Sequence, residues 1–451
     1  MADPAIRLYD TRTRTLRPLE PRDAGRVGIY ACGPTVYSRI HVGNARPFVV
    51  FSLFKRFLEH AGLEVTLVVN VTDVNDKIYV AAGVGSSVEL AAQMTAAYIA
   101  DTDRLHLGRP DHEPLASEWI PTILAEIETL IGAGFAYEAD GDVYFRVRAD
   151  AAYGGLSHRA LDAMDQGEDV AGAARKEDPL DFALWKAQKP GEDAAWDSPW
   201  GRGRPGWHIE CSAMAEALLG VGFDIHGGGL DLLFPHHENE AAQTRCARSA
   251  ELARLWMHNG MLAAPDGEKM SKSVGNIAPL HEALDRHGRD ALLLYLVSGH
   301  YRQPIAYGEE PLHQAQQSVA RIREAARALV AGPSPAELRP LRERFFAALA
   351  EDFHTPSALA AMWDWVREAN RRGRDVGDAD LREMLAVLGL ENLLEERAPD
   401  APAHVAGLAD ERAAARAGGD YARADELRAQ IEALGWAVRD TLGGGHELTP
   451  R

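Results

Sequence analysis

The sequence predicts an α/β protein of Rossmann type whose parallel-sheet domain carries an insertion, followed by an α-helical bundle and a small C-terminal subdomain. Three observations predict this fold class. A strand–loop–helix–strand order opens the chain, which indicates a parallel sheet. The 451 residues exceed what one hydrophobic core fills, since single cores stop growing near ~250–300 residues. Strands give way to helices from about residue 311 onward.

The first β–α–β unit lies near the N-terminus. Residues 27–31 form a short apolar run that ends at the turn signal Gly33-Pro34. The stretch 48–60 has helical periodicity, with phenylalanines on one face, and Gly62 ends it. Residues 65–69 then have the composition of a buried strand.

The middle of the chain continues with helices and then loses its periodicity. Helices are expected at 88–103 and 117–132, and a strand is expected at 142–147. Residues 149–206 are rich in Gly, Pro and Asp, which predicts an irregular insertion. The sheet pattern resumes near residues 223–226.

The last third of the chain is helical. Its Ala-, Leu- and Arg-rich segments are interrupted at Gly332-Pro333 and at 373–377, where we expect helices to end. A last helix at 421–434 precedes a short strand candidate at 436–438. We therefore expect a bundle of helices and, after it, a small subdomain.

Composition excludes several classes of protein. The 46% hydrophobic and 25% charged residues are ordinary for a globular chain, which excludes collagen-like and disordered proteins. No run of ~18 apolar residues and no signal peptide is found, so we expect neither a membrane span nor secretion. Cys32, Cys211 and Cys246 are an odd, widely spaced set that favours the reducing cytoplasm. The net charge of −19 disfavours a nucleic-acid partner, although a groove can be locally basic.

The segment His41-Val42-Gly43-Asn44 lies between the first strand and its helix. In a Rossmann half, this is where a phosphate meets a helix N-terminus. Gly43 lets the backbone approach a ligand closely, and a neutral imidazole can donate to a phosphate oxygen. Taken alone, the segment has a more ordinary interpretation, in which the histidine caps the helix or lies on the surface.

The segment Lys269-Met270-Ser271-Lys272-Ser273 holds two of only seven lysines in the chain. It lies in a polar loop, and two ammonium groups with two hydroxyls can gather a triphosphate. They can also stabilise charge that develops on departing pyrophosphate. In isolation, a solvated surface loop explains the same residues.

Together the two segments resemble the paired HIGH and KMSKS motifs of class I aminoacyl-tRNA synthetases. Four further segments are similar to cysteinyl-tRNA synthetases: residues 32–37, 70–77, 206–212 and 226–240. The resemblance runs from near residue 6 into the C-terminal helices, and it is most specific in the catalytic half. Ser38, Val42 and His354 depart from the commonest pattern of that family, and the chain lacks its aromatic-basic ending.

The resemblance implies a division of the chain into six segments. The expected order is the first half of a Rossmann catalytic domain (1–118), a connective insertion (119–204), the second half of the catalytic domain with zinc ligands (205–250), a KMSKS and stem-contact region (251–312), a helical anticodon-binding domain (313–400) and a small C-terminal subdomain (401–451). Arg-rich helices with Trp363, Trp365 and Trp436 have the composition to stack on unpaired bases, although a core role is the more ordinary one.

A metal site is a second expectation. His236 and Glu240 are four residues apart, so on a helix both reach one ion. Cys32 follows the first strand and Cys211 precedes a predicted helix, so the two thiols can converge at the sheet edge. This spacing is unlike a compact zinc finger, and buried free cysteines remain the alternative. The resemblance implies that these four residues are the family's Zn²⁺ ligands.

The resemblance also implies the other site residues. The implied catalytic residues are His41, Asn44, Lys269 and Lys272. The implied ATP-binding residues are His41, Gly43, Asn44, Gly228, Asp231, Lys269, Met270, Ser271, Lys272 and Ser273. The implied substrate-binding residues are Thr72, Trp207, His208 and His237.

The function implied is ATP-dependent ligation of L-cysteine to tRNA(Cys) through a cysteinyl-adenylate, with Mg²⁺ accompanying ATP and Zn²⁺ recognising the cysteine thiolate. A monomeric cytoplasmic enzyme without an editing domain is expected. Two rival hypotheses stay open. One is a ligase that joins cysteine to an amino sugar in mycothiol biosynthesis, and the other is a non-catalytic paralogue that binds only zinc or RNA.

Overall fold

The computed structural model describes residues 5–161, 164, 174–263, 278–373, 375–394, 401–440 and 446–450. The chain divides into two compact units, residues 1–391 and residues 392–451.

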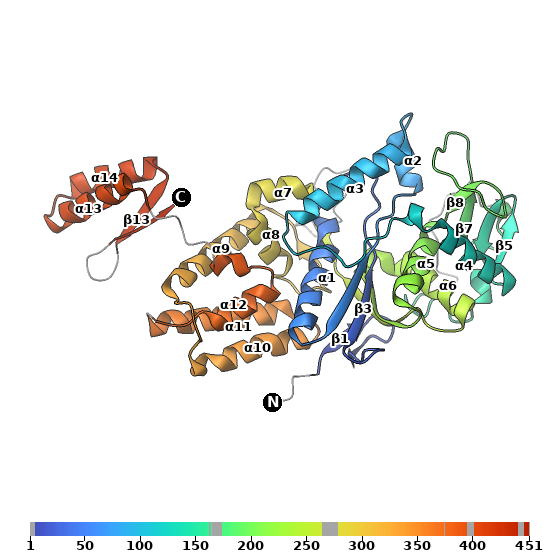
Figure 1. The fold of residues 1–451 in the computed structure, drawn as a ribbon, viewed down its shortest axis with the longest axis horizontal. Helices are drawn as coiled ribbons and strands as arrows, with labels where there is room; N and C mark the ends of the chain where they lie inside the picture. Colours follow the sequence, from blue (N-terminus) through green and yellow to red (C-terminus); the bar gives the residue numbers. More distant parts are fainter. Residues whose placement is uncertain are drawn as a thin grey trace. The chain divides into compact units, whose positions relative to one another are not determined.

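A four-stranded parallel sheet forms the centre of the first unit (Figure 1). Its strand order is β10-β9-β3-β4. The strands are β3 (Arg26–Ala31), β4 (Glu64–Val69), β9 (Phe223–Gly229) and β10 (Ala253–Asn259). Most of their residues are buried, as parallel strands covered on both faces require. The Rossmann-type α/β prediction is thereby confirmed at its first β–α–β unit and at 223–226, whereas β10 was not predicted.

Helix α1 (Val42–His60) connects β3 to β4 and begins six residues earlier than its apolar periodicity predicted. Its start is set by a capping box, in which His41 accepts from Asn44 and the Asn44 side chain accepts from the His41 backbone. Pro47 lies inside the helix but close to its beginning. The phenylalanine face predicted for this helix is buried.

The insertion contains a sheet, so its predicted irregularity was wrong. After α2 (Asp76–Ala82), α3 (Ser87–Asp103) and α4 (Ile120–Gly132), four strands pair antiparallel in the order β5-β6-β7-β8. The last two, β7 (Phe182–Ala187) and β8 (Gly203–Pro205), fall inside the stretch expected to be irregular. They are short, and β7 begins with four consecutive buried residues, so neither has the alternation that marks a half-buried strand. The remaining strands are β5 (Ala136–Ala139) and β6 (Asp142–Phe145).

The second half of the sheet domain begins where β8 leads into α5 (Trp207–Leu219). Cys211 lies inside α5 and not before it, contrary to expectation. Strand β9 follows, then a helical turn (Leu233–His237) that runs into α6 (Glu238–Arg248). His236 and Glu240 are therefore neighbours on consecutive helical turns, as their spacing predicted.

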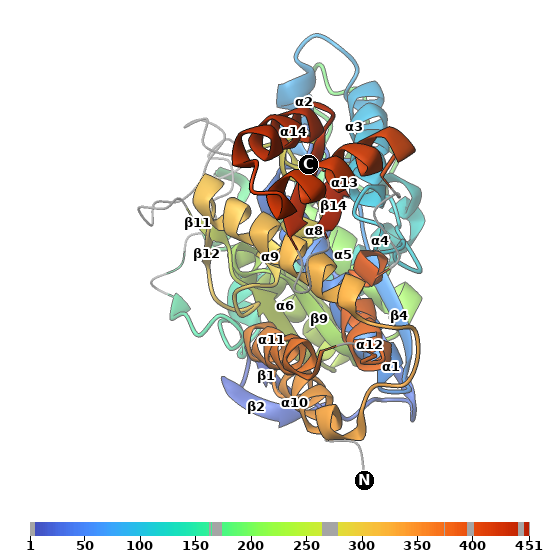
Figure 2. The ribbon, with the colours of Figure 1, turned by 90° about the vertical axis from the view of Figure 1, so that its left-hand side faces the viewer.

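Helices dominate the rest of the first unit, as predicted. The elements are β11 (Leu262–Ala263), α7 (Leu280–His287), α8 (Arg289–Leu296), β12 (Ile305–Ala306), α9 (Glu309–Ala328), α10 (Arg339–Ala350), α11 (Thr355–Arg372) and α12 (Ala379–Val387). Figure 2 shows α12 beside α1, and Arg56 of α1 donates to the carbonyl of Ala386 at 3.0 Å. Trp365 is fully buried and donates to Asp380 at 3.2 Å, which gives it a core role.

The second unit pairs two helices with a hairpin. It consists of α13 (Ala403–Ala417), α14 (Tyr421–Ala433), β13 (Trp436–Asp440) and β14 (His446–Pro450). Its core contains Val405, Ala409, Ile431 and Val438. The terminal strand was predicted, but its antiparallel partner β14 was not. Across the described parts of both units, no helix is long and apolar enough to cross a membrane.

Candidate functional site

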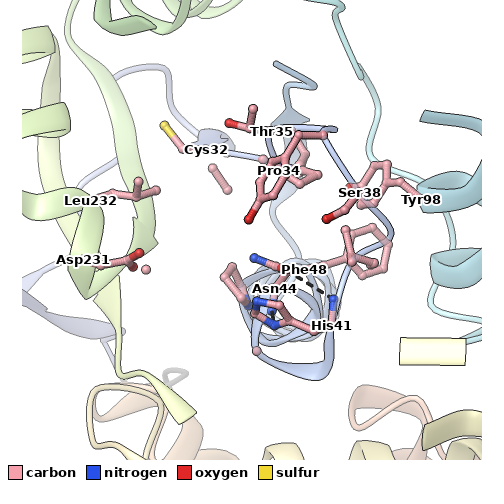
Figure 3. A pocket seen from close by; sticks show the side chains of 18 of the residues that line it. Cys32, Pro34, Thr35, Ser38, His41, Asn44, Phe48, Tyr98, Asp231 and Leu232 are labelled. Carbon is pink, nitrogen blue, oxygen red and sulfur yellow. Dashed lines mark hydrogen bonds between the residues drawn. The ribbon is translucent and has the colours of Figure 1, made fainter. Parts of the chain in front are cut away.

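A cavity of about 300 Å³ lies at the carboxyl edge of the parallel sheet. The last residue of each parallel strand lines it: Ala31, Val69, Gly229 and Asn259. Ligands of Rossmann-type sheets bind at this edge, where loops and helix N-termini converge. Figure 3 shows Asp231 and Leu232 on one side of this cavity and Ser38 and Tyr98 on the other.

The beginning of α1 forms one wall of the cavity. His41 Nδ1 accepts a hydrogen bond from the Asn44 backbone at 3.1 Å (Figure 3). A Cβ atom on Gly43 would lie 3.0 Å from the His41 ring, so the glycine makes room for the imidazole. The predicted phosphate-binding residues His41, Gly43 and Asn44 therefore stand together on the cavity wall.

Four buried side chains from three segments of the chain meet beside the cavity: Cys32, Cys211, His236 and Glu240. One donor atom from each lies within 4.8 Å of the others. Glu240 Oε1 is 3.0 Å from His236 Nε2 and 3.6 Å from Cys32 Sγ. Cys32 directly follows β3, so the cluster also touches the cavity, which Cys32 lines. The structure brings together the four residues that the resemblance assigned to zinc.

The electrostatics of this cluster favour a cation. A hydrogen bond from Cys32 lowers the pKa of the Cys211 thiol to about 6. Burial would raise the pKa of Glu240, but His226 and His236 outweigh burial and hold it well below its usual range. Burial would lower the pKa of His236, but Glu240 and Cys211 outweigh burial and raise it to about 10. The cluster thus presents a thiolate and a carboxylate against a single imidazole in a buried place, where uncompensated charge is costly. Two sulfur donors with an imidazole and a carboxylate fit Zn²⁺.

Two further histidines, to which the sequence pattern assigns no role, lie beside the cluster. His226 lies 3.0 Å from the Tyr30 carbonyl and 2.8 Å from Glu240 Oε2, so it orients the second carboxylate oxygen. His258 lies 2.8 Å from His237, whose Nε2 is 3.3 Å from Cys32 Sγ. Cys32, Glu240, His226 and His237 also form an alternative donor group.

The predicted substrate residues take different places. The Trp207 ring lines the cavity and stacks on the His236 ring, with centroids 4.2 Å apart. His208 is buried behind it, 2.9 Å from His236. Thr72 is buried, and its backbone pairs with the segment after Cys32, so it supports the cavity wall and does not line the cavity.

The two residues predicted to contact the adenylate, one on β9 and one after it, also differ in whether they line the cavity. Asp231 lines the cavity, whereas Gly228 lies within the buried strand. A Cβ on Gly228 would lie 3.2 Å from the His237 ring, so this glycine makes room for that histidine. Its neighbour Gly229 lines the cavity instead.

The predicted loop residues Lys269, Met270, Ser271, Lys272 and Ser273 lie outside the described residues. The described segments on either side of that stretch both contact α1 or the residues just before it. Leu280 donates to the Ile40 carbonyl at 3.0 Å, and Val42 donates to the Ala278 carbonyl at 3.1 Å. Arg46 of α1 reaches the carbonyls of Gly260 and Met261 on the other side.

Comparison with known proteins gives consistent matches along the chain. Residues 18–317 match the family model of the class I (C) tRNA synthetase catalytic domain. Residues 344–393 match the DALR domain, and residues 398–446 match the cysteinyl-tRNA ligase anticodon-binding domain.

Full-length relatives are similar over nearly the whole chain. A cysteine–tRNA ligase of Brevibacillus brevis is 44% identical over 97% of this chain and 98% of its own length. One of Chromohalobacter salexigens is 43% identical over the same shares.

Solved structures share the fold at low sequence identity. A methionyl-tRNA synthetase of Mycobacterium tuberculosis in complex with methionyl-adenylate covers 82% of this chain and 89% of its own, with a TM-score of 0.59 at 16% identity. A leucyl-tRNA synthetase complex from Agrobacterium radiobacter covers 84% and 85%, with a TM-score of 0.61 at 11% identity.

Proposed function

Because this chain belongs to the cysteine–tRNA ligases among the class I aminoacyl-tRNA synthetases, we propose that it forms a cysteinyl-adenylate from L-cysteine and ATP and passes the cysteine to tRNA(Cys). One observation carries the proposal. The buried cluster of Cys32, Cys211, His236 and Glu240 adjoins the same cavity that the beginning of α1 lines. A site that recognises a thiol and a helix N-terminus that binds phosphate can therefore contact the same bound molecule.

Amino-acid recognition depends on the cluster. When bound there, Zn²⁺ supplies a soft Lewis acid that ligates the thiolate of the substrate. Trp207 lines the cavity beside the cluster, and its ring stacks on that of His236. This stacking fixes the orientation of His236 as a zinc ligand. Serine has nearly the same size as cysteine, and an apolar pocket alone separates such analogues by only ~10–200-fold. Thiolate recognition removes that limit, and a separate editing site becomes unnecessary.

In the first step, the cysteine carboxylate attacks the α-phosphorus of ATP, and pyrophosphate leaves. His41 and the backbone at Gly43 and Asn44 bind the phosphates at the start of α1. Lys269 and Lys272 stabilise the negative charge on the departing pyrophosphate. Mg²⁺ accompanies the ATP phosphates, as it commonly does. In the second step, a terminal ribose hydroxyl of tRNA attacks the acyl carbonyl and AMP leaves.

A charging assay with tRNA(Cys) tests the proposal, with cysteine and serine compared as substrates. We expect cysteine to be charged, and serine to be disfavoured by clearly more than the ~200-fold limit of an apolar pocket. Removal of bound zinc with a chelator should abolish cysteine activation. Discrimination of serine within that limit, or full activity of the metal-free protein, would refute thiolate recognition.

The rival amino-sugar ligase predicts a different acceptor. Ligation of cysteine to the aminated sugar–inositol acceptor, without tRNA charging, would establish that alternative. The non-catalytic alternative predicts no cysteine-dependent exchange of pyrophosphate with ATP. We also propose that the enzyme is a cytoplasmic monomer. The three free, buried cysteines support the cytoplasmic location, because disulfides are rare in that compartment.

A further inference from the structure

Lys77 on α2 occupies a position that the reaction described so far does not use. Its side chain lines the cavity together with the rings of Tyr37 and Trp207. The ammonium nitrogen lies 5.8 Å from the centroid of Tyr37 and 5.9 Å from that of Trp207. Cations are attracted to aromatic faces at such distances, so the two rings favour this position of the exposed Lys77 side chain at the cavity.

This ammonium has no carboxylate partner among the described residues. Lys55 pairs with Asp111 at 2.7 Å, and Lys186 pairs with Asp76 at 2.9 Å. Arg39, the other described Lys or Arg that lines the cavity, pairs with Asp101 at 2.6 Å. Lys77 therefore offers an ammonium outside any described ion pair at a cavity that, on the proposed function, receives anionic substrates.

Contacts on the far side of α2 fix the place of Lys77. Asp76 binds both Lys186 and Arg204 of the insertion sheet, so it is not available to its neighbour in sequence. The Tyr79 hydroxyl donates to the Ala194 carbonyl at 2.7 Å. The insertion thus holds α2 from outside while Lys77 faces the cavity.

The position of Trp207 indicates which anion Lys77 meets. Trp207 contacts His236 of the candidate zinc site and, on another side, the Lys77 ammonium. Cysteine is a short molecule, so a substrate whose sulfur reaches the cluster presents its carboxyl group near Trp207. The phosphate joined to that carboxyl in the adenylate then lies within reach of Lys77.

Resting on the function proposed above, we propose that Lys77 binds a non-bridging oxygen of the α-phosphate of ATP and keeps this contact in the cysteinyl-adenylate. Lysine suits this role because its ammonium is a compact point charge on a flexible stem. Negative charge on the α-phosphate changes during attack, so the contact contributes to the rate of adenylation and not to cysteine affinity.

Cysteine-dependent ATP–pyrophosphate exchange of the full-length enzyme tests this role. We expect Lys77→Met to lower kcat roughly 10–100-fold, the range for loss of one hydrogen bond to a charged group. The KM for cysteine and the zinc content should stay within about twofold of wild type, and Lys77→Arg should recover much of the loss. Lys55→Met is the matched control, since Lys55 lies outside the cavity, and its kcat should be unchanged.

Phosphorothioate ATP distinguishes a direct contact from a structural effect. Wild type should prefer one diastereomer of ATP that carries sulfur at the α-phosphate, and Lys77→Met should lose that preference. The same experiment with Lys77→Gln covers the case in which the methionine variant does not fold. A wild-type kcat in Lys77→Met, a raised cysteine KM alone, or an unchanged diastereomer preference would overturn the proposal. Absence of exchange in wild type would instead refute the proposed function itself.

Discussion

Two buried cysteines of this chain have opposite surroundings. Cys211 meets Cys32, His236 and Glu240, and its pKa is lowered to about 6 by the hydrogen bond from Cys32. Cys246 packs into the apolar core of the insertion side, where burial raises its pKa to about 12. The first thiol is suited to bind a metal, and the second behaves as a small apolar residue.

The same substitution at both cysteines separates these roles. Cys211→Ser should lose bound zinc and cysteine activation together, because a hydroxyl is a poor zinc donor at neutral pH. Cys246→Ser should retain both and lose only some stability. Zinc per chain and pyrophosphate exchange are the measurements. Full zinc content in Cys211→Ser would show that the zinc binds elsewhere in the protein.

A substitution at Gly43 should lower activity without lowering stability. An added Cβ would lie 3.0 Å from the His41 ring and push it aside. Alanine is also a better helix former than glycine by about 1 kcal/mol. We expect Gly43→Ala to leave the thermal midpoint unchanged or higher while adenylation falls about tenfold, equivalent to about 1.4 kcal/mol in the barrier. Unaltered adenylation would show that the His41 ring is not held by this contact.

Residue identities around the cluster were predictable only in part from the sequence. The four donors were assigned by resemblance, and the structure brings them together. The contributions of His226 and His258 could not be read from the sequence, because β9 and β10 must pair before these side chains reach Glu240 and His237. His226 ends the predicted strand segment 223–226, but β9 is buried throughout and has no alternation to show which face its side chain takes, and His258 lies in β10, which was not predicted.

At the scale of elements, α1 connects the separate parts of the catalytic domain. Arg46 is fully buried in it and donates to four backbone carbonyls, those of Gly260, Met261, His300 and Gln303. Burial lowers the Arg46 pKa to about 10. A Cβ on Gly260 would lie 2.4 Å from the Gln303 backbone, so the segments that Arg46 joins approach each other closely.

Removal of Arg46 should leave those carbonyls without a donor. Each unsatisfied buried polar group costs about 1–3 kcal/mol, so Arg46→Met should lower the free energy of unfolding by several kcal/mol. Arg46→Lys should be less damaging, since an ammonium can still donate to part of the set. Urea titration measures both, and an Arg46→Met protein as stable as wild type would contradict this role.

Elements with strong helical periodicity or apolar runs were predicted well, and strands β6 and β13 were also predicted, whereas β7, β8, β10 and β14 were not. The start of α1 was placed late because a capping box, not an apolar residue, begins it. Strands β7 and β8 were missed because they are only six and three residues long, show no alternation, and lie in a stretch rich in turn formers. Their stability comes from pairing, of β7 with β6 and of β8 with β7, and from the buried Phe182 and Trp185 of β7, which sequence position alone does not reveal.

At the scale of the whole molecule, the candidate site and the anticodon-binding domain match lie in different compact units. Every described residue of the candidate site lies in residues 1–391. The second unit has its own core and contains the anticodon-binding domain match, residues 398–446. Removal of the second unit should therefore weaken tRNA binding and leave cysteine activation intact.

A chain that ends at Glu391 tests this separation. Pyrophosphate exchange should stay within about twofold of the full-length enzyme, because no described cavity residue is removed. Charging at limiting tRNA should fall by at least about tenfold, equivalent to about 1.4 kcal/mol of lost binding. Circular dichroism of the truncated chain is the control for folding. Equal loss in both assays would mean that the second unit supports the catalytic site itself.

The strand order has a consequence for how the chain is made. Strand β3 lies between β4 and β9, yet Phe223 of β9 follows Ala31 of β3 by 192 residues. At about 5–20 residues per second, synthesis of that stretch takes roughly 10–40 s. Throughout this time the edge of β3 that β9 will cover stays open, and Cys32 has none of its cluster partners. The nascent protein therefore passes through a half-sheet state whose exposed edge a chaperone can protect.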